Sequence, residues 1–200
     1  MESSVMTNFS LWSPTRAGSR RSRPAAAFAM AVVSVAALSA CGADDEPAAG
    51  PLPATKFTKN GVTVDLRVAE WKAPNGTLEV TFTPTDEGFH LYSADLPADG
   101  VEGVGRPTVV ALSGAITAAG EPTASSSVSN IRVPGVKSTV PVYPDGPVTL
   151  TVPVHTDGTG NAAALLTYAS CSTAEGCTVP VEKHPVALHV TDAEVAFSGH

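Results

Sequence analysis

The 200-residue sequence lacks an apolar run long enough to span a bilayer. The apolar stretch from Pro24 to Ala40 is shorter than the roughly 20 residues that a transmembrane helix requires. No later stretch stays apolar over that length. The sequence therefore predicts no spanning helix, and attachment to a membrane would need another kind of anchor.

Basic residues are also scarce, with 12 lysines and arginines against 19 aspartates and glutamates. Four of the basic residues but only one of the acidic ones precede Cys41, so the remainder carries a net charge of −10. Binding of nucleic acid needs a basic face, and electrostatic binding to anionic lipid needs a basic cluster. The charge balance argues against both, and against nucleic acid as a partner.

Patterns typical of a metal, cofactor or hydrolase site are missing. No histidine and cysteine are spaced as zinc or copper ligands, no Gly-x-Ser-x-Gly frame is present, and no Cys-x-x-Cys occurs. We expect neither a cofactor nor a metal. We expect the five histidines to be scattered over the surface: His90, His155, His184, His189 and His200.

The amino terminus has the pattern of a lipoprotein signal peptide. Arginines from Arg16 to Arg23 precede the apolar stretch, which ends in Leu38-Ser39-Ala40-Cys41. This lipobox predicts cleavage before Cys41 and a lipid on its thiol, and the apolar stretch is too short for an uncleaved anchor. The predicted location is the extracytoplasmic face of the cell membrane, where disulfides are permitted. With Cys41 lipidated, the other two of the three cysteines are left as one pair.

The chain after residue 40 divides into a tether, a domain and a tail. Residues 41–56 are rich in proline, alanine and acid, which predicts a flexible tether. Residues 57–195 alternate apolar and polar side chains over short runs separated by turn sequences, with no helical periodicity. This pattern predicts an all-β, immunoglobulin-like antiparallel β-sandwich, followed by a tail at 196–200. Gly100–Arg106 and Glu121–Val136 are predicted as long loops.

Cys171 and Cys177 flank a short polar segment between two predicted strands. Cysteines across such a hairpin have Cα atoms about 5.5 Å apart, which permits a disulfide. A bond closing about seven residues contributes only about 2.4 kcal/mol in the chain-entropy treatment, and the domain is large enough to bury a core without it. The residues alone leave a structural staple and an exchange site both open.

The cysteine segment resembles the active-site segment of the amino-terminal periplasmic domain of the thiol:disulfide interchange protein DsbD. The resemblance lies in Tyr168-Ala-Ser-Cys171, five residues, and Cys177-Thr-Val-Pro180, and in Gly88-Phe-His-Leu-Tyr92. It implies a sandwich that takes electrons from a membrane-embedded thiol carrier and reduces disulfides of thioredoxin-like extracytoplasmic proteins. By this resemblance Cys177 forms the mixed disulfide and Cys171 resolves it, with Tyr92 and Tyr168 packed nearby.

The chain departs from the family at several of these positions. Ser170 stands at a family glycine, Thr178 at an aromatic residue and Val179 at a proline. The family's shielding loop holds acidic and aromatic residues, whereas Val128–Val140 has neither. The predicted function is a lipid-anchored thiol–disulfide exchange domain, a component of protein-disulfide reduction. The alternative is a non-enzymatic immunoglobulin-like surface lipoprotein with a structural Cys171–Cys177 bond.

Overall fold

The structure is a computed structural model that describes residues 52–198. The predicted signal peptide, Cys41, most of the tether and His200 lie outside the described residues. The described part contains these strands: β1 (Ala54–Lys59), β2 (Val62–Lys72), β3 (Asn75–Pro84), β4 (His90–Leu91), β5 (Val109–Gly114), β6 (Ile116–Ala118), β7 (Thr123–Ala124), β8 (Ser129–Ile131), β9 (Val140–Val142), β10 (Val148–Thr156), β11 (Gly160–Tyr168), β12 (Ser170–Ser172), β13 (Gly176–Cys177), β14 (Val181–Val190) and β15 (Val195–Phe197).

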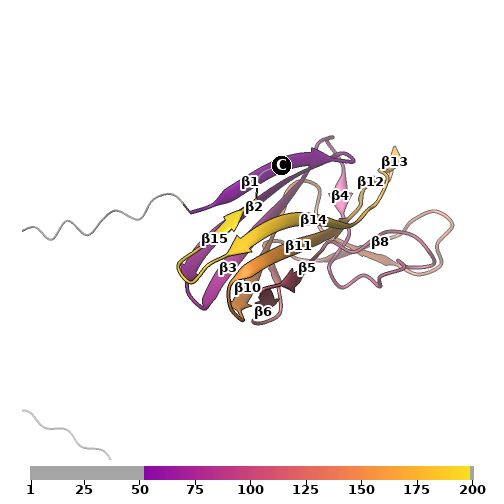
Figure 1. The fold of residues 1–200 in the computed structure, drawn as a ribbon. Coiled ribbons are helices and arrows are strands. Elements are labelled where there is room, and N and C mark those ends of the chain that lie inside the picture. The colour runs from indigo at the N-terminus through magenta and orange to yellow at the C-terminus, as the bar shows by residue number, and fades with distance from the viewer. Residues whose placement is uncertain (1–51, 199–200) are drawn as a thin grey trace, which may run out of the picture. The chain divides into compact units, whose positions relative to one another are not determined.

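Two antiparallel sheets form the body of the domain (Figure 1). One has the order β1-β2-β3-β10-β6, with β7 also paired to β10, and the other has the order β15-β14-β11-β5. Within the described range the chain has no helix, and therefore no helix that could cross a bilayer. The predicted all-β, immunoglobulin-like antiparallel sandwich is confirmed.

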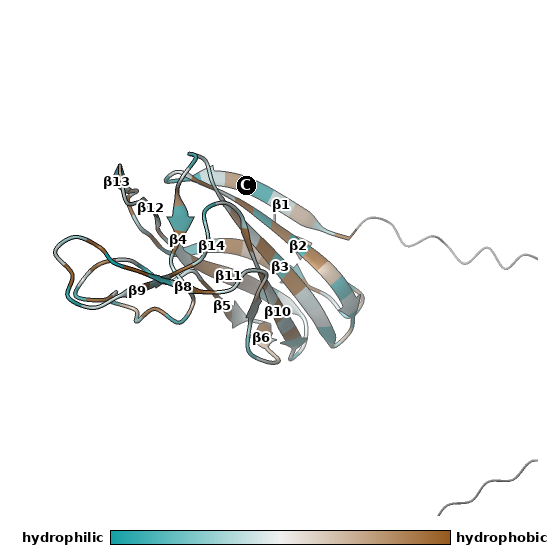
Figure 2. Ribbon diagram, turned by 180° about the vertical axis from the view of Figure 1, so that it is seen from behind, coloured by the Kyte–Doolittle hydropathy of each residue, from teal (hydrophilic) through white to brown (hydrophobic). Residues whose placement is uncertain are grey.

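The main core lies between the two sheets, because alternate residues of their strands face inward. In β2, Val62, Val64, Leu66 and Val68 are all buried, while the residues between them are not. The same period of two runs along β3, β10, β11 and β14. Figure 2 shows it as alternating brown and teal bands along β2 and β3. Each strand thus buries one apolar face against the opposite sheet.

The first hairpin is fixed by a two-residue turn, Asn60-Gly61. Both residues have positive φ, at 50° and 75°, as a type I′ turn requires. Asparagine and glycine adopt this conformation at little cost, and the turn matches the twist of the flanking strands. The turn sets the register of β1 on β2, in which Lys59 pairs with Val62.

Because β1 begins at Ala54 and β15 ends at Phe197, the strands extend slightly beyond the expected 57–195 on both sides.

Two smaller sheets lie at one end of the sandwich, where β4, β12 and β13 are grouped (Figure 1). One has the order β13-β12-β4, and the other pairs β8 with β9. The segment 121–136, expected to be a loop, therefore contains the short strands β7 and β8. β7 pairs with β10, which is distant in sequence, and β8 pairs with β9 across residues 132–139. With two and three residues, the strands are too short to show a period of their own. The two small sheets carry the cysteine pair and its surroundings.

Candidate disulfide-exchange site

Cys171 and Cys177 are bonded across the β12–β13 hairpin, with an S–S distance of 2.05 Å. They are direct register partners, and their Cα atoms are 4.0 Å apart. The predicted disulfide is confirmed. The Cα separation is shorter than the expected value of about 5.5 Å, because Thr178 N donates to the Ser170 carbonyl and so makes Cys171 and Cys177 a non-hydrogen-bonded pair, with Cα atoms about 4.5 Å apart. The turn between them is closed by Ala174 N, which donates to Ser172 Oγ, and by Gly176 at a φ of 92°.

The two cysteines differ in exposure. Cys171 is 3% exposed, whereas Cys177 is an exposed residue on the two-residue strand β13. Cys171 belongs to a second hydrophobic cluster, separate from the main core, whose buried members are Tyr92, Leu96, Val140, Val142, Ala169 and Cys171. A molecule approaching the disulfide from solvent therefore meets Cys177 first.

Tyr92 contacts both sulfur atoms from inside the domain. Its hydroxyl donates to Cys171 Sγ at 3.0 Å and lies 3.6 Å from Cys177 Sγ. Burial raises the pKa of Tyr92, so the phenol stays protonated and available as a donor. Gly105 lies under the ring at a φ of 87°, where an added Cβ would come within 2.7 Å of a ring carbon. The predicted near-site residue Tyr92 is therefore held against the disulfide.

Tyr168 lies in the main core instead. Its ring makes an edge contact with Phe82 at a centroid distance of 5.4 Å, and its hydroxyl donates to the carbonyl of Lys59. Burial raises the pKa of Tyr168 to about 12. The residue lines neither hollow beside the disulfide. The structure thus brings Tyr92, and not Tyr168, to the sulfur atoms.

His90 is a site residue that the sequence analysis did not single out. It is buried, and its backbone pairs with Cys171. Its Nδ1 lies 3.6 Å from Asp145 Oδ1, and its ring meets that of Tyr92 in a T-shaped contact at 6.0 Å. Burial lowers the pKa of His90, and the charge of Asp145 offsets part of this shift. The expectation of a surface histidine is wrong here. Its spacing of two from Tyr92 in a strand was the available signal, because such residues share a face.

Two hollows flank the disulfide and are lined by both cysteines. One, of about 160 Å³, lies between the disulfide and the end of β8 with the segment that follows it, which contribute Ile131, Val133 and Pro134. The other, of about 280 Å³, is bounded by the turn from Gly103 to Arg106 and by Pro180. The cysteine pair therefore has open space on two sides.

The segment between β8 and β9 covers part of the second cluster with aliphatic side chains. Val133 and Val136 pack against that cluster, and the segment has no aromatic or acidic residue of its own. A carboxylate from elsewhere holds it, because Glu102 Oε1 accepts from the backbone N–H groups of Lys137 and Ser138. Glu102 lies in a turn at a φ of 52°. The segment between β8 and β9 therefore covers the second cluster with aliphatic side chains, where the sequence analysis expected none of the family's acidic and aromatic residues.

The chain after Cys177 is braced from the β1–β2 turn and from β12. Thr178 N and Oγ1 both donate to the Ser170 carbonyl, at 2.9 and 3.2 Å. Asn60 Nδ2 donates to the carbonyl of Val179 at 3.0 Å. The side chain of Val179 remains 72% exposed. Thr178, which departs from the family pattern, therefore closes the neck of the hairpin, and an apolar side chain stands beside Cys177 on the outside.

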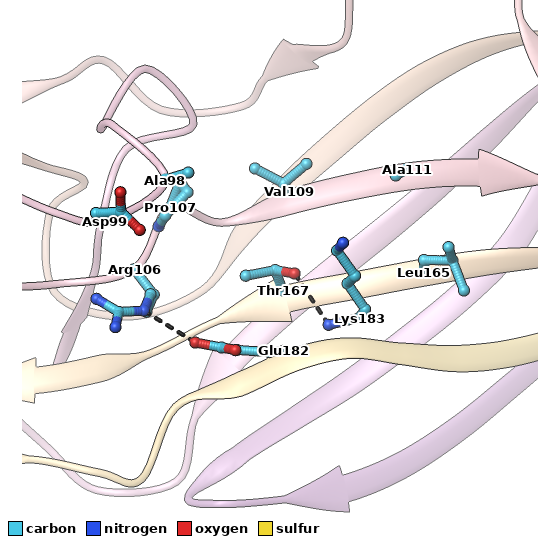
Figure 3. Close-up of a pocket in the computed structure, with 10 residues that line it drawn as sticks. All are labelled: Ala98, Asp99, Arg106, Pro107, Val109, Ala111, Leu165, Thr167, Glu182 and Lys183. Carbon is cyan, nitrogen blue, oxygen red and sulfur yellow. Dashed lines mark hydrogen bonds and ion pairs between the residues drawn. The ribbon is translucent and has the colours of Figure 1, made fainter.

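Three titratable residues lie close to the cysteines in sequence: Glu175, Lys183 and His184. Glu175 is exposed in the hairpin turn, and His184 contacts Phe57 and Lys59 of β1. Lys183 lines a separate hollow of about 360 Å³ over β5, β11 and β14, where Arg106 Nε pairs with Glu182 (Figure 3). None of these three side chains lines a hollow beside the disulfide. Residues 52–198 hold no group of three or more His, Cys, Asp or Glu side chains arranged for a metal.

Comparisons with known proteins give one distant likeness. No family model matches the chain, and no curated protein matches it. Among solved structures, the crystal structure of the Neisseria meningitidis DsbD n-terminal domain in the reduced form is similar at a TM-score of 0.44 and 16% identity. The match covers 70% of this chain and 91% of that one. A likeness at this level assigns no activity, so the surroundings of the disulfide have to carry the functional argument.

Proposed function

We propose that Cys171 and Cys177 are a redox-active pair that reduces disulfides in thioredoxin-like extracytoplasmic proteins. The observation that carries the proposal is the unequal setting of the two sulfurs. Cys177 is exposed, whereas Cys171 is buried and accepts a hydrogen bond from Tyr92. Thiol–disulfide exchange needs one accessible sulfur for attack and a second, protected sulfur to complete the transfer. We therefore assign the mixed disulfide to Cys177 and its resolution to Cys171.

The position of the bond supports this role over one in folding. The disulfide joins β12 to a two-residue strand at one end of the domain, outside the main core. It closes a short loop, for which the chain-entropy contribution is about 2.4 kcal/mol. The apolar Val179 beside Cys177 gives a partner an exposed surface to contact. A staple for the sandwich would gain more by joining its two sheets.

The sequence supports an extracytoplasmic place for this reaction. The lipobox at Cys41 predicts a lipid anchor on the extracytoplasmic face of the cell membrane. In the proposed cycle a membrane-embedded thiol carrier reduces the pair, which gains two electrons and two protons as its S–S bond breaks. The dithiol then passes both electrons to the client disulfide. The anchor would keep the domain within reach of the carrier.

The burial of Cys171 also favours a second candidate function. A buried cysteine within a hydrophobic cluster is a common setting for an inert structural bond. In that case the domain is a non-enzymatic immunoglobulin-like surface lipoprotein, and the Cys171–Cys177 bond only orders the hairpin. The two functions differ in whether Cys177 forms an intermediate with another protein.

Trapping of the mixed disulfide separates these two functions. In Cys171→Ala the exposed Cys177 remains, and nothing can resolve a bond that it forms. Mixed with a purified, oxidised thioredoxin-like protein, this variant should accumulate a covalent complex, which peptide mass spectrometry should assign to Cys177. The matched variant Cys177→Ala, with only the buried Cys171, should trap far less. Equal trapping by both variants, or by neither, would contradict the proposed roles.

A further inference from the structure

His90, Cys171 and Cys177 form one row across three strands. His90 on β4 is the register partner of Cys171 on β12, and Cys171 is the partner of Cys177 on β13. Directly opposed residues of antiparallel strands project to the same face, with Cβ atoms about 4.5–5.5 Å apart. The imidazole of His90 is therefore the cross-strand neighbour of the buried sulfur, on the side away from Cys177.

Asp145 faces the imidazole from the chain between β9 and β10. Its Oδ1 lies 3.6 Å from His90 Nδ1, and its side chain is exposed while that of His90 is buried. The segment that carries Asp145 is fixed to the start of β4 by Gly146 N, which donates to the Phe89 carbonyl. With Nδ1 turned to the carboxylate, Nε2 is the nitrogen that can accept a proton. A carboxylate at this place stabilises the imidazolium that would form.

The hollow of about 160 Å³ beside the disulfide is shared by His90, Tyr92 and both cysteines. A water molecule needs only about 15 Å³ of such volume, so a proton can pass from Cys171 to His90 directly or through water. Tyr92 faces His90 from its own strand, the two cysteines from β12 and β13, and Asp145 from the β9–β10 segment. The end of β8 and the segment after it contribute only uncharged side chains to this hollow: Ile131, Val133 and Pro134. Asp86 and Glu87 line an adjoining hollow with Asp145, outside this one.

We infer that His90, supported by Asp145, accepts the proton of the Cys171 thiol when that thiol resolves the mixed disulfide. The inference rests on the proposed redox function and names a residue that serves it. A buried thiol surrounded by apolar side chains resists ionisation, and Cys171 must ionise before it can attack. His90 is the side chain beside this thiol that can accept a proton, because Arg106, which lines the other hollow, is already protonated.

The exposed Cys177 thiol first loses its proton to solvent. The Cys177 thiolate attacks the client disulfide, which forms the Cys177–client bond and releases one client sulfur as a thiolate. The Cys171 proton then moves to His90, and the Cys171 thiolate attacks Cys177 Sγ. The Cys171–Cys177 bond forms, the Cys177–client bond breaks, and the second client sulfur leaves as a thiolate. Two electrons have passed to the client, and the proton on His90 leaves to that thiolate or to solvent past Asp145.

The burial of His90 also sets the direction of the pH dependence. Because burial lowers the pKa of His90, the neutral imidazole prevails at neutral pH and is free to accept a proton. As the pH falls through this pKa, His90 becomes protonated and can no longer take the proton. Resolution by Cys171 should therefore slow on the acid side in the wild type, whereas without His90 it should depend on spontaneous ionisation of the thiol and rise only at alkaline pH.

The test follows the thiols of Cys171 and Cys177 with dithiobis(nitrobenzoate), in the lipidated protein, where Cys41 has no free thiol. Reduced protein releases one thionitrobenzoate when Cys177 attacks the reagent and a second when Cys171 resolves the mixed disulfide, and the second phase measures the step at issue. In His90→Gln this phase should slow by about 100-fold at neutral pH, the scale of general-base assistance, and its pH profile should shift to higher pH. Asp145→Asn should slow the same phase by a smaller factor.

His155 provides the matched control. It forms a pair with Asp157, also at 3.6 Å, but on β10 and away from the disulfide hollows. His155→Gln should leave both phases unchanged. An unaltered pH profile in folded His90→Gln would overturn the inference. If His90→Gln does not fold, Asp145→Asn decides, because its side chain is exposed and an unchanged second phase there also overturns it. Failure of the redox function itself would show separately, as the absence of trapped client.

Discussion

Tyr92→Phe removes one oxygen atom from the wall of the disulfide site and leaves the ring in place. The hydroxyl is 3.0 Å from Cys171 Sγ and 3.6 Å from Cys177 Sγ. The ring is buried with Leu96, Val142 and Ala169 in the second hydrophobic cluster, so the cluster should persist in the variant. The change isolates what the hydrogen bond contributes to each redox state.

The expected effect follows from the charge on sulfur. A hydrogen bond to a charged acceptor contributes about 1.5–3 kcal/mol, and one to a neutral acceptor about 0.5–1.5 kcal/mol. The hydroxyl therefore stabilises the reduced, ionised pair over the disulfide by about 1–1.5 kcal/mol. At 30 mV for about 1.4 kcal/mol in a two-electron couple, the potential of Tyr92→Phe should be about 20–30 mV more negative than that of the wild type. The shift should fade at lower pH, where the thiol is protonated.

The assay is equilibration in thiol–disulfide redox buffers at alkaline pH, with the reduced fraction read by alkylation and mass spectrometry. Tyr168→Phe is the control, because it also loses a buried hydroxyl, one that bonds the Lys59 carbonyl in the main core. It should lower stability by about 1 kcal/mol without changing the potential. A potential of Tyr92→Phe equal to the wild-type value, or less negative, would refute the proposed contact between the hydroxyl and the Cys171 thiolate.

Two further perturbations test the cover and the bond. Glu102→Ala removes the acceptor for the N–H groups of Lys137 and Ser138. The freed segment should let dithiothreitol reduce the disulfide faster, and no change in that rate would show that the segment does not limit access. Its control is Glu121→Ala, because Glu121 is exposed and lines neither hollow beside the disulfide. Cys171→Ser with Cys177→Ser should lower the free energy of unfolding by about 2.4 kcal/mol. The sandwich should still unfold in one transition in denaturant, whereas loss of the fold would favour the structural role.

Much of the fold could be predicted from local sequence. The alternation of apolar and polar residues predicts β2 as a strand with one buried face. The spacing of the two cysteines predicts a hairpin between them. The short strands β7 and β8 could not be predicted, because they exist only through pairing with β10 and β9. They contain too few residues for any periodicity to be visible.

The candidate site divides in the same way. The cysteine spacing permits the disulfide, whereas the place of Tyr92 was implied only by the family resemblance, which put Tyr168 near the pair as well. The ion pair of His90 with Asp145 and the anchoring of the 137–138 backbone by Glu102 join residues that are far apart in the chain. The spacing of two between His90 and Tyr92 indicates a shared face, but the pairing of His90 with Cys171 is visible only in the folded chain. The aliphatic cover over the second cluster also could not be predicted, because Glu102 holds the segment between β8 and β9 from a turn that is distant in the chain.

The reduction potential of the Cys171–Cys177 pair in the full chain tests the central claim most directly. Equilibration with a redox buffer of known potential, followed by alkylation of free thiols, measures it without any client. A redox-active pair should have a potential above about −300 mV, within the range of thiol–disulfide exchange proteins. A potential below about −300 mV is the value of a permanent structural bond and would contradict the account.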